Sequence, residues 1–398
     1  MPTRSLPLNG LKVLELGQLI AGPFATKLMG EFGADVIKVE PPGAGDPLRK
    51  WRILDEGTSL WWQVQSRTKR AVTLDLRTEE GQDMIRRLAT EADVVVENFR
   101  PGTLEKWGLG YEALEAVNPK LILVHVSGFG QTGPYRDKPG FGVIGEAMGG
   151  LRYLTGHQGQ PSVRVGVSIG DSLSALYAVI GTLLALQERH SSGLGQEIDV
   201  ALYESVFAMM ESLLPEFDAT GQVREPSGSA LPGITPSNAY RTRDGGYVLI
   251  AGNGDSIFKR LMGVIGREDL AHHPEMAHND GRSKHAHMID TAIEAWTQTH
   301  HRDDILKALD DARVPAGYPY TAADIANDPH YLAREMIQYV TRADGRTLKV
   351  PGVLPKLSAT PGRLGCGGPA LGEHTDEVLE ELGIDAATRN KLRLAGII

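Results

Sequence analysis

From residue 12 to residue 126 the sequence alternates between short β-rich runs and helical stretches. The strand-like runs are Lys12–Leu16, Asp35–Val39, Ala71–Leu76, Asp93–Val96 and Leu121–Val126. Helical patterns lie between them, at 24–32, 78–91 and 111–117. Such alternation predicts βαβ units and an α/β fold, with a parallel sheet covered by helices on both faces. Ligands of such sheets bind beyond the carboxyl ends of the strands.

The character of the sequence changes at Arg224. Residues 224–236 are rich in Pro, Gly and Ser and are typical of a linker. A strand at Tyr247–Ala251 and helices at 256–265, 288–299 and 302–312 follow. We therefore predict a large domain over 1–223, a smaller α+β domain over 224–320, and a return of 321–398 to the large domain.

Histidines are frequent in the predicted small domain. They include His272, His273, His278, His285, His287, His300 and His301. No spacing places two of them on one helical face with a carboxylate in register, so we predict solvated loops and no metal site.

The charge balance and the cysteine count exclude several classes of protein. The chain has 41 Lys and Arg against 50 Asp and Glu, a net charge of −9, which argues against nucleic acid as a partner. Cys366 is the only cysteine, so an intrachain disulfide is excluded and a cytoplasmic location is favoured. Residues 1–9 lack the apolar core of a signal peptide. The apolar window Ala175–Leu186 is shorter than the ~18 residues that span a bilayer, so we predict a buried helix and no membrane.

Two glycine motifs invite a functional interpretation. Residues 108–113 fit the dinucleotide pattern, but a turn and a short helix precede them where a strand is needed. Gly166–Gly170 matches the nucleophile elbow of serine hydrolases, with Ser168 at its centre and a strand predicted over 162–167. The pattern arises readily by chance in a chain with 47 glycines, and no particular histidine is selected as the base.

Asp171 follows this motif at the start of a helix predicted over Ser172–Gln187. That helix is apolar on most sides, so we predict that it is buried. A helix N-terminus favours an ionised carboxylate. Asp171 is therefore either a capping residue or a nucleophile that attacks an activated acyl group.

Around these residues the chain resembles the class III CoA-transferase family, which includes formyl-CoA:oxalate, carnitine and succinyl-CoA-dependent dicarboxylate CoA-transferases. The resemblance runs in order along nearly the whole chain. It is carried by Leu8–Gly45, Thr68–Gly81, Glu97–Gly110, Asn118–Tyr135, Gly195–Ser205 and Gly372–Gly383.

The resemblance implies a Rossmann-like large domain built from both chain ends, a small domain between them, and an interlocked homodimer. It places the catalytic aspartate of the family at Asp171 and its active-site glutamine at Gln18. It implies CoA contacts at Val39, Glu40, Pro41, Leu74, Leu76, Asn98, Phe99, Arg100, Arg136 and Lys138, with no metal. Coenzyme A thioesters are then substrates and no cofactor is held permanently. The basic groups suit the CoA phosphates.

Two departures from the family pattern narrow the range of activities that we expect. Ser227–Gly233 lacks the glycine run of formyl-CoA:oxalate enzymes, which makes a dicarboxylate with succinyl-CoA as donor the better prediction. Related 2-methylacyl-CoA racemases carry a histidine base where this chain has Phe141, so two-base racemisation lacks one group. The alternatives are a racemase of this fold, a Ser168-dependent thioesterase and a non-catalytic acyl-CoA binding protein.

Overall fold

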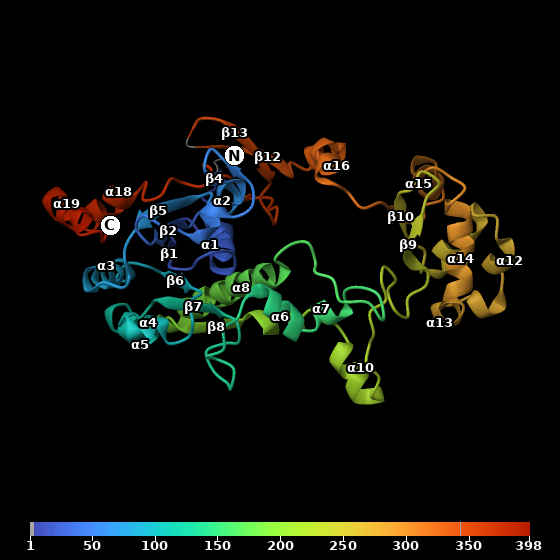
Figure 1. The fold of residues 1–398 in the computed structure, drawn as a ribbon, viewed down its shortest axis with the longest axis horizontal. Helices are drawn as coiled ribbons and strands as arrows, with labels where there is room; N and C mark the ends of the chain where they lie inside the picture. The colour runs from blue at the N-terminus through green and yellow to red at the C-terminus, as the bar shows by residue number, and fades with distance from the viewer. Residues whose placement is uncertain (1–3, 343) are drawn as a thin grey trace. The chain divides into compact units, whose positions relative to one another are not determined.

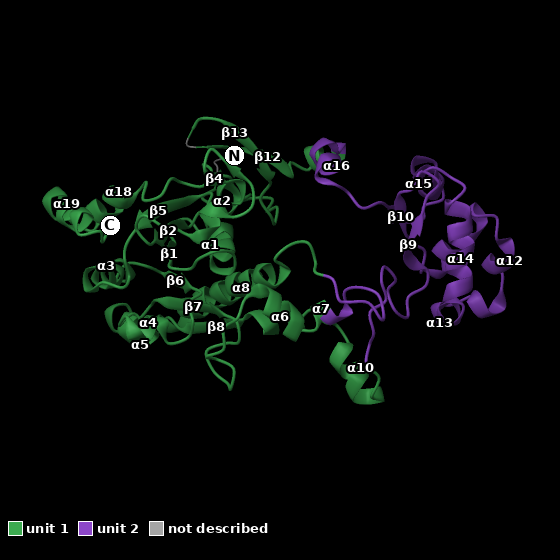
Figure 2. Ribbon diagram, in the orientation of Figure 1, with its two compact units in different colours: residues 1–152, 164–222, 330–398 green, residues 153–163, 223–329 purple. Residues whose placement is uncertain are grey.

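The computed structural model describes residues 4–342 and 344–398 (Figure 1). The chain divides into two compact units. Unit 1 comprises residues 1–152, 164–222 and 330–398, and unit 2 comprises 153–163 and 223–329 (Figure 2). The domain boundaries predicted at 224 and 320 lie near the unit boundaries at 223 and 329. The sequence analysis assigned residues 153–163 to the large domain, whereas they belong to unit 2. The division into folding domains stays a prediction.

Unit 1 is built on a six-stranded sheet in which every neighbouring pair is parallel. The strands are β1 (Lys12–Glu15), β2 (Asp35–Glu40), β5 (Lys69–Thr73), β6 (Val94–Glu97), β7 (Ile122–Ser127) and β8 (Glu197–Ala201). Their spatial order is β5-β2-β1-β6-β7-β8. This is the strand order of doubly wound, Rossmann-type sheets, whose ligand crevice lies where the order reverses, here between β1 and β6.

Helices cover both faces of this sheet (Figure 1). Helices α1 (Ala21–Glu31) and α8 (Ile169–Ser192) share one apolar core with Val13 of β1. Helices α3 (Glu79–Ala89), α5 (Tyr111–Val117), α18 (Thr375–Glu381) and α19 (Ala386–Leu394) share the other with Leu14. Adjacent residues of one strand thus enter opposite cores, as the two-residue period of a strand requires.

Local signals explain where α3 begins and ends. The Thr78 side chain caps it by accepting a hydrogen bond from the Gly81 N–H group. Glu79 and Glu80 lie in the first turn, and Arg86 and Arg87 lie in the last turn. Acidic side chains near the N-terminus and basic side chains near the C-terminus stabilise a helix through its dipole.

The C-terminal segment returns to unit 1 and packs on β5. The Thr73 N–H group donates to the Thr375 hydroxyl oxygen at 3.0 Å, and the His374 N–H group donates to the Ala71 carbonyl oxygen at 2.9 Å. Val378 and Leu379 of α18 are fully buried in the sheet's core.

Shorter elements complete unit 1 and its borders. They are η1 (Pro47–Lys50), β3 (Leu54–Asp55), β4 (Thr58–Ser59), α2 (Leu60–Gln65), α4 (Thr103–Lys106), α6 (Gly142–Met148), α7 (Leu151–Leu154), α9 (Leu202–Phe207), α10 (Leu213–Thr220), α17 (Pro329–Ala333), β12 (Ile337–Thr341) and β13 (Thr347–Pro351).

Unit 2 has its own core around a small antiparallel sheet. Its strands are β9 (Ser237–Arg241), β10 (Tyr247–Ala251) and β11 (Ala316–Gly317), in the order β11-β10-β9. The helical elements are α11 (Asp255–Val264), α12 (Glu268–Ala271), η2 (Pro274–Met276), α13 (Asn279–Lys284), α14 (Ala286–Thr297), α15 (Arg302–Asp311) and α16 (Ala322–Asn327). Tyr240, Phe258 and Ile293 are among the buried residues of this core.

Two local predictions are wrong. No strand forms over 162–167, which is irregular, so the strand that a nucleophile elbow needs is absent. Helix α8 is also not buried on all sides, because Leu176, Ile180 and Leu184 are 45%, 51% and 66% exposed in the single chain. These leucine and isoleucine side chains are exposed because the apolar surface of α8 extends around most of the helix, whereas a sheet covers only one stripe of a helix.

Helix α8 also exceeds the apolar window seen in the sequence. It has 24 residues and, by length and composition only, is the one helix among the described residues that could cross a membrane; 33% of its most apolar window is buried. Core helices of soluble proteins pass the same test.

Candidate active site

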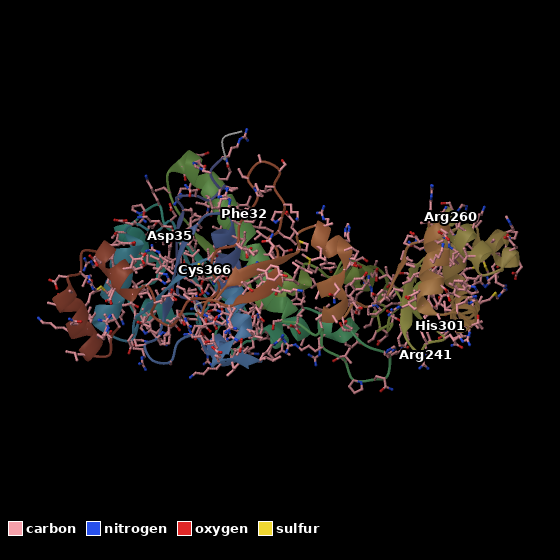
Figure 3. The ribbon with its side chains drawn as sticks, turned by 90° about the horizontal axis from the view of Figure 1, so that it is seen from above. Phe32, Asp35, Arg241, Arg260, His301 and Cys366 are labelled. Carbon is pink, nitrogen blue, oxygen red and sulfur yellow. The ribbon has the colours of Figure 1, made fainter. Side chains whose placement is uncertain are left out.

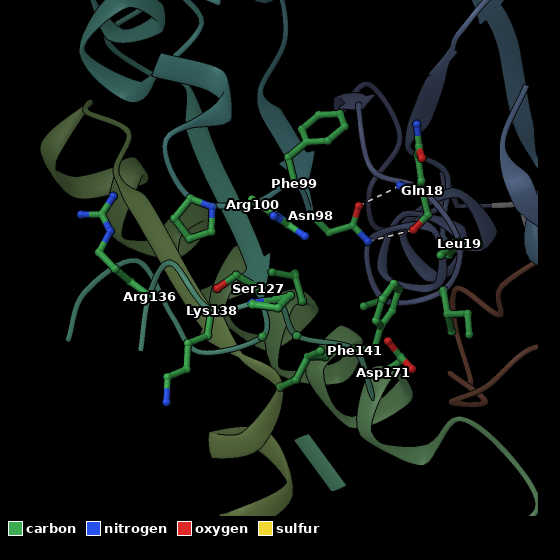
Figure 4. A pocket seen from close by; sticks show the side chains of 18 residues that line it. Gln18, Leu19, Asn98, Phe99, Arg100, Ser127, Arg136, Lys138, Phe141 and Asp171 are labelled. Atoms are coloured by element: carbon green, nitrogen blue, oxygen red, sulfur yellow. Dashed lines mark hydrogen bonds between the residues drawn. The ribbon is translucent and has the colours of Figure 1, made fainter. Parts of the chain in front are cut away.

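A cavity of about 290 Å³ opens at the carboxyl ends of β1, β6 and β7 (Figure 4). This is the place where the strand order reverses, and therefore where a doubly wound sheet binds ligands. The cavity is lined by 18–21 after β1, 98–101 after β6, 126–128 at the end of β7, the loop residues 136 and 138–141, Asp171 of α8 and Leu202 of α9.

Gln18 and Asn98 bridge the two central loops. The Asn98 side chain accepts from the Gln18 N–H group and donates to the Gln18 carbonyl oxygen, both at 2.8 Å (Figure 4). Leu19 follows in a left-handed conformation, with φ of 64°. Its N–H group donates to both carboxylate oxygens of Asp46 at 3.1 Å. A strained backbone of this kind persists only where its surroundings hold it, and it is common at functional sites.

A buried cluster of charges supports this loop from below. The Lys38 ammonium donates to Glu15 Oε1 at 2.7 Å and to the Gly17 carbonyl oxygen at 2.9 Å, and it lies 2.9 Å from Asp46 Oδ2. Lys69 lies 2.7 Å from Glu15 Oε2. Burial alone would raise the pKa of Glu15, but Lys38 and Lys69 hold it below its usual value. Burial lowers the pKa of Lys69 to about 8. The cluster connects β1, β2 and β5 to the loop that carries Gln18.

Asp171 lies in the first turn of α8 and lines the cavity. Burial raises the pKa of Asp171 to about 6, the Glu146 carboxylate adds to the rise, and the Arg164 guanidinium opposes it. The sequence led us to expect that the helix N-terminus would favour the ionised form. Burial and the Glu146 carboxylate, which the local sequence does not reveal, act in the opposite direction.

Gly142 at the start of α6 makes room for the Asp171 carboxylate. A Cβ atom built at Gly142 would lie 2.1 Å from Asp171 Oδ2, far inside van der Waals contact. A side chain at this position is therefore incompatible with the observed carboxylate position.

On the sequence prediction that Asp171 is the nucleophile, we expect Gly142→Ala to lower kcat about 100-fold, because displacing a reacting group by about 1 Å costs that much. Alanine suits a helix, so the melting temperature should change little. Gly317→Ala is the control, because a Cβ there meets nothing within 4 Å. Wild-type kcat in Gly142→Ala would contradict the expected displacement.

Three predicted CoA-binding cations surround the mouth of the cavity. Arg100, Arg136 and Lys138 are exposed and line it (Figure 4). Lys138 Nζ lies 3.5 Å from the centroid of the Tyr135 ring. Phe99 packs edge-on against Trp107, with ring centroids 5.2 Å apart. The cavity therefore brings one half-buried carboxylate, that of Asp171, together with three exposed cations.

The remaining predicted CoA contacts lie outside this cavity. Val39 and Leu74 are core residues of the sheet, and Leu76 packs against the same core. Glu40 is buried, and its two carboxylate oxygens accept hydrogen bonds from Arg49 at 2.7 Å. Pro41 follows β2 without lining the cavity. Their contact with CoA stays a prediction.

Ser168 faces a different cavity from Asp171. That cavity, of about 390 Å³, is lined by Ser168 and Ser172 together with parts of α1 and α2. Among the described residues no histidine hydrogen-bonds Ser168. The arrangement lacks the neighbouring base that a serine nucleophile needs.

The histidines of unit 2 pair with neighbouring groups or face solvent. His278 Nδ1 lies 2.9 Å from Asp255, and His301 is exposed, as are Arg241 and Arg260 (Figure 3). In 4–342 and 344–398, no three His, Cys, Asp or Glu side chains are grouped to hold a metal ion.

The sequence analysis missed the residues that support the cavity without lining it. Lys38, Asp46 and Glu15 carry no motif, although a lysine inside the apolar strand β2 was a signal of a buried ion pair. Glu146 and Gly142 become relevant only because α6 packs on the start of α8. No local pattern shows that contact.

Residues 8–375 match the model of CoA-transferase family III. The chain belongs to this family. The prediction made from the sequence is thereby confirmed, and the chain is a family III CoA-transferase with an α/β fold and a parallel central sheet. CoA thioesters are the substrates of such enzymes.

Relatives of this CoA-transferase match it over nearly its full length. The succinyl-CoA–D-citramalate CoA-transferase of Chloroflexus aurantiacus is 51% identical over 377 residues, which cover 94% of either chain. The succinyl-CoA–L-malate CoA-transferase beta subunit of the same organism is 42% identical over 401 residues, covering 100% of this chain and 99% of that one. The crystal structure of a CaiB/BaiF family protein from Brucella suis has a TM-score of 0.83 at 37% identity, covering 95% of this chain and 100% of that one.

Proposed function

We propose that this CoA-transferase moves CoA reversibly between succinyl-CoA and a dicarboxylic acid of four or five carbons, with Asp171 as the nucleophile. The observation that carries the proposal is the Asp171 carboxylate inside a cavity whose rim holds Arg100, Arg136 and Lys138. A carboxylate can exchange acyl groups, and cations can bind the CoA phosphates.

The reaction proceeds by two exchanges at Asp171. A carboxylate oxygen of Asp171 attacks the succinyl-CoA carbonyl carbon, the carbon–sulfur bond breaks, and CoA leaves as a thiolate. The thiolate then attacks the Asp171 carbonyl of this mixed anhydride, which gives an aspartyl-CoA thioester and free succinate. The acceptor acid reverses the same two steps. Each step exchanges one activated acyl bond for another, so no external energy source enters.

The supporting residues hold the reacting groups in place. Asn98 fixes the backbone of Gln18. The Gln18 side chain extends away from Asp171 (Figure 4), so contact with the reacting carboxyl group requires a different rotamer of Gln18. The rim cations bind the phosphate end of CoA, and the cavity of about 290 Å³ accommodates the pantetheine end and a small acid. Holding both substrates in one orientation supplies much of the rate.

The choice of substrates rests on the two relatives, whose names specify succinyl-CoA together with citramalate or malate. Both acids carry two carboxylates and a hydroxyl group. The 51% identity to the citramalate enzyme makes a five-carbon hydroxy dicarboxylate the first acceptor to test.

The assembly and location that we propose follow the expectations from the sequence. They are an interlocked homodimer in the cytoplasm, without a permanently held cofactor and without nucleic acid or membrane as a partner. The exposed apolar face of α8, with Leu176, Ile180 and Leu184, supports a further subunit contact.

Isotope exchange tests the proposed function. Incubation of the protein with succinyl-CoA and carbon-13 succinate should move label into succinyl-CoA, and added citramalate or malate should yield new CoA esters. Mass spectrometry of the CoA esters measures both. Release of free CoA without label exchange would point to a thioesterase. Deuterium uptake at the α-carbon of a 2-methylacyl-CoA without CoA transfer would point to a racemase.

A further inference from the structure

Glu146 is a buried carboxylate whose helix packs against the turn that carries Asp171. It is 1% exposed and lies four residues after Gly142 in α6, so both residues share one helical face. That face packs on the start of α8. A Cβ atom at Gly170 would lie 3.3 Å from Glu146 Cγ, just as a Cβ at Gly142 would meet Asp171. Glu146 therefore contacts the residue directly before Asp171.

The carboxylate of Glu146 is poorly compensated. Among the described residues its Oε1 atom has no hydrogen-bond partner. Its Oε2 atom lies 3.5 Å from the Arg164 Nε atom, and the Arg164 side chain is 45% exposed. Burying a carboxylate oxygen without a partner is costly, and such groups in native proteins call for a specific explanation.

We propose that Glu146 is a positioning residue that keeps the Asp171 carboxylate basic and therefore strongly nucleophilic. Two carboxylates in one poorly solvated region repel each other. When Asp171 forms its bond to the acyl carbon and the electron pair of the carbon–sulfur bond leaves with CoA, the negative charge of Asp171 is removed. Acylation thus relieves the repulsion, and Glu146 favours the covalent states over the free carboxylate. This inference rests on the proposed function.

The charges around Asp171 have opposing effects. Burial raises the pKa of Asp171 to about 6, Glu146 contributes to the rise and Arg164 lowers it. Other charged or titratable side chains lie on the packed elements. They are Arg100, Arg136 and Lys138 of the cavity lining, the hydrogen-bonded Tyr203 and Glu204 of α9, the paired Lys27 and Glu31 of α1, the paired His125 of β7 and Glu197 of β8, and Asp199 of β8, which accepts from the Gln131 N–H group. Because transfer needs the ionised form, activity should fall as the pH drops through about 6.

The test is the pH profile of Glu146→Gln, which removes the charge and keeps the shape. We expect the acid limb of the kcat/KM profile to move down by about one pH unit, because a like charge no longer opposes ionisation. The rate at about pH 5 relative to about pH 8 should rise about fivefold. At about pH 8, kcat should fall about threefold to tenfold with KM for the acyl-CoA unchanged, because a less basic nucleophile reacts more slowly.

Two further variants separate charge from structure. Arg164→Gln removes the opposing cation and should move the acid limb upward, the reverse of Glu146→Gln. Glu146→Asp keeps the charge and should leave the limb within about half a pH unit of wild type. If Glu146→Gln fails to fold, Glu146→Met, which also removes the charge and has a side chain of similar length, takes its place, and an unmoved acid limb in that variant overturns the inference.

An infrared titration provides a readout without turnover. The spectrum of wild type minus Asp171→Asn isolates the Asp171 carboxyl band, and the same difference is taken in the Glu146→Gln background. An unmoved Asp171 titration in Glu146→Gln would overturn the inference even if CoA exchange is normal. CoA exchange that survives in Asp171→Asn would instead overturn the proposed function, so the two failures are distinguishable.

Discussion

Replacing Asp171 by Asn is expected to lower the rate of CoA exchange by about 10⁴-fold, because a neutral amide cannot attack the thioester to form an anhydride. Asn has nearly the same size as Asp, so the cavity and the cations at its rim remain in place. Acyl-CoA binding should therefore stay within about threefold of wild type. Single-turnover exchange of labelled succinate measures the rate, and the mass of the intact protein shows whether a covalent CoA adduct still forms.

Ser168→Ala is the matched control for this variant. Ser168 lies three residues before Asp171, caps α8 without a side-chain hydrogen bond, and faces another cavity. Exchange in Ser168→Ala should stay within about threefold of wild type. The opposite outcome is that Asp171→Asn keeps more than about a tenth of the wild-type rate and Ser168→Ala loses its activity. That outcome would identify Ser168 as the nucleophile.

Replacing Lys38 by Met is expected to lower the free energy of unfolding by about 3–5 kcal/mol. Lys38 is fully buried and lies within 2.9 Å of Glu15, Asp46 and the Gly17 carbonyl oxygen. Its removal leaves Glu15 with Lys69 as its remaining ammonium partner, and leaves Asp46 without its ammonium partner. Urea denaturation followed by circular dichroism measures the change.

A surface lysine of the neighbouring strand provides the comparison for Lys38. Lys12 in β1 pairs with Glu91 at 2.5 Å, but both side chains are more than half exposed, at 52% and 69%. Lys12→Met should therefore cost about 0–1 kcal/mol, since water solvates the remaining carboxylate. Equal losses in the two variants would show that burial of the Lys38 cluster contributes nothing to stability.

The strands of unit 1 were predictable because their pattern is local. Residues 35–39, 93–96 and 121–126 were predicted as strands, and β2, β6 and β7 occupy 35–40, 94–97 and 122–127. Strands buried on both faces are short continuous apolar runs, which the sequence displays directly. Tyr247–Ala251 was predicted with the bounds that β10 has.

The failures in prediction arise where local pattern and packing disagree. Val163, Val165 and Val167 alternate with other residues as a strand would, yet 162–167 pairs with no neighbouring strand. Helix α8 is apolar enough to be buried all round, yet the sheet and its neighbours cover only part of it. A strand needs a partner and a buried helix needs a complete cover, and neither is encoded within the segment itself.

The sequence by itself determined the fold class, the family, and the prediction that Asp171, Gln18 and the cations after β6 and β7 serve one site. Only the tertiary structure decided which of these residues meet. It brings Asp171, Gln18, Asn98 and Arg100 into one cavity and leaves Leu74 in the core. It also packs Glu146 against the turn that carries Asp171, and it places the Lys38 ammonium against the loop that carries Gln18. The physical reason is that periodicity is a property of one segment, whereas burial and charge–charge interaction depend on segments far apart in the chain.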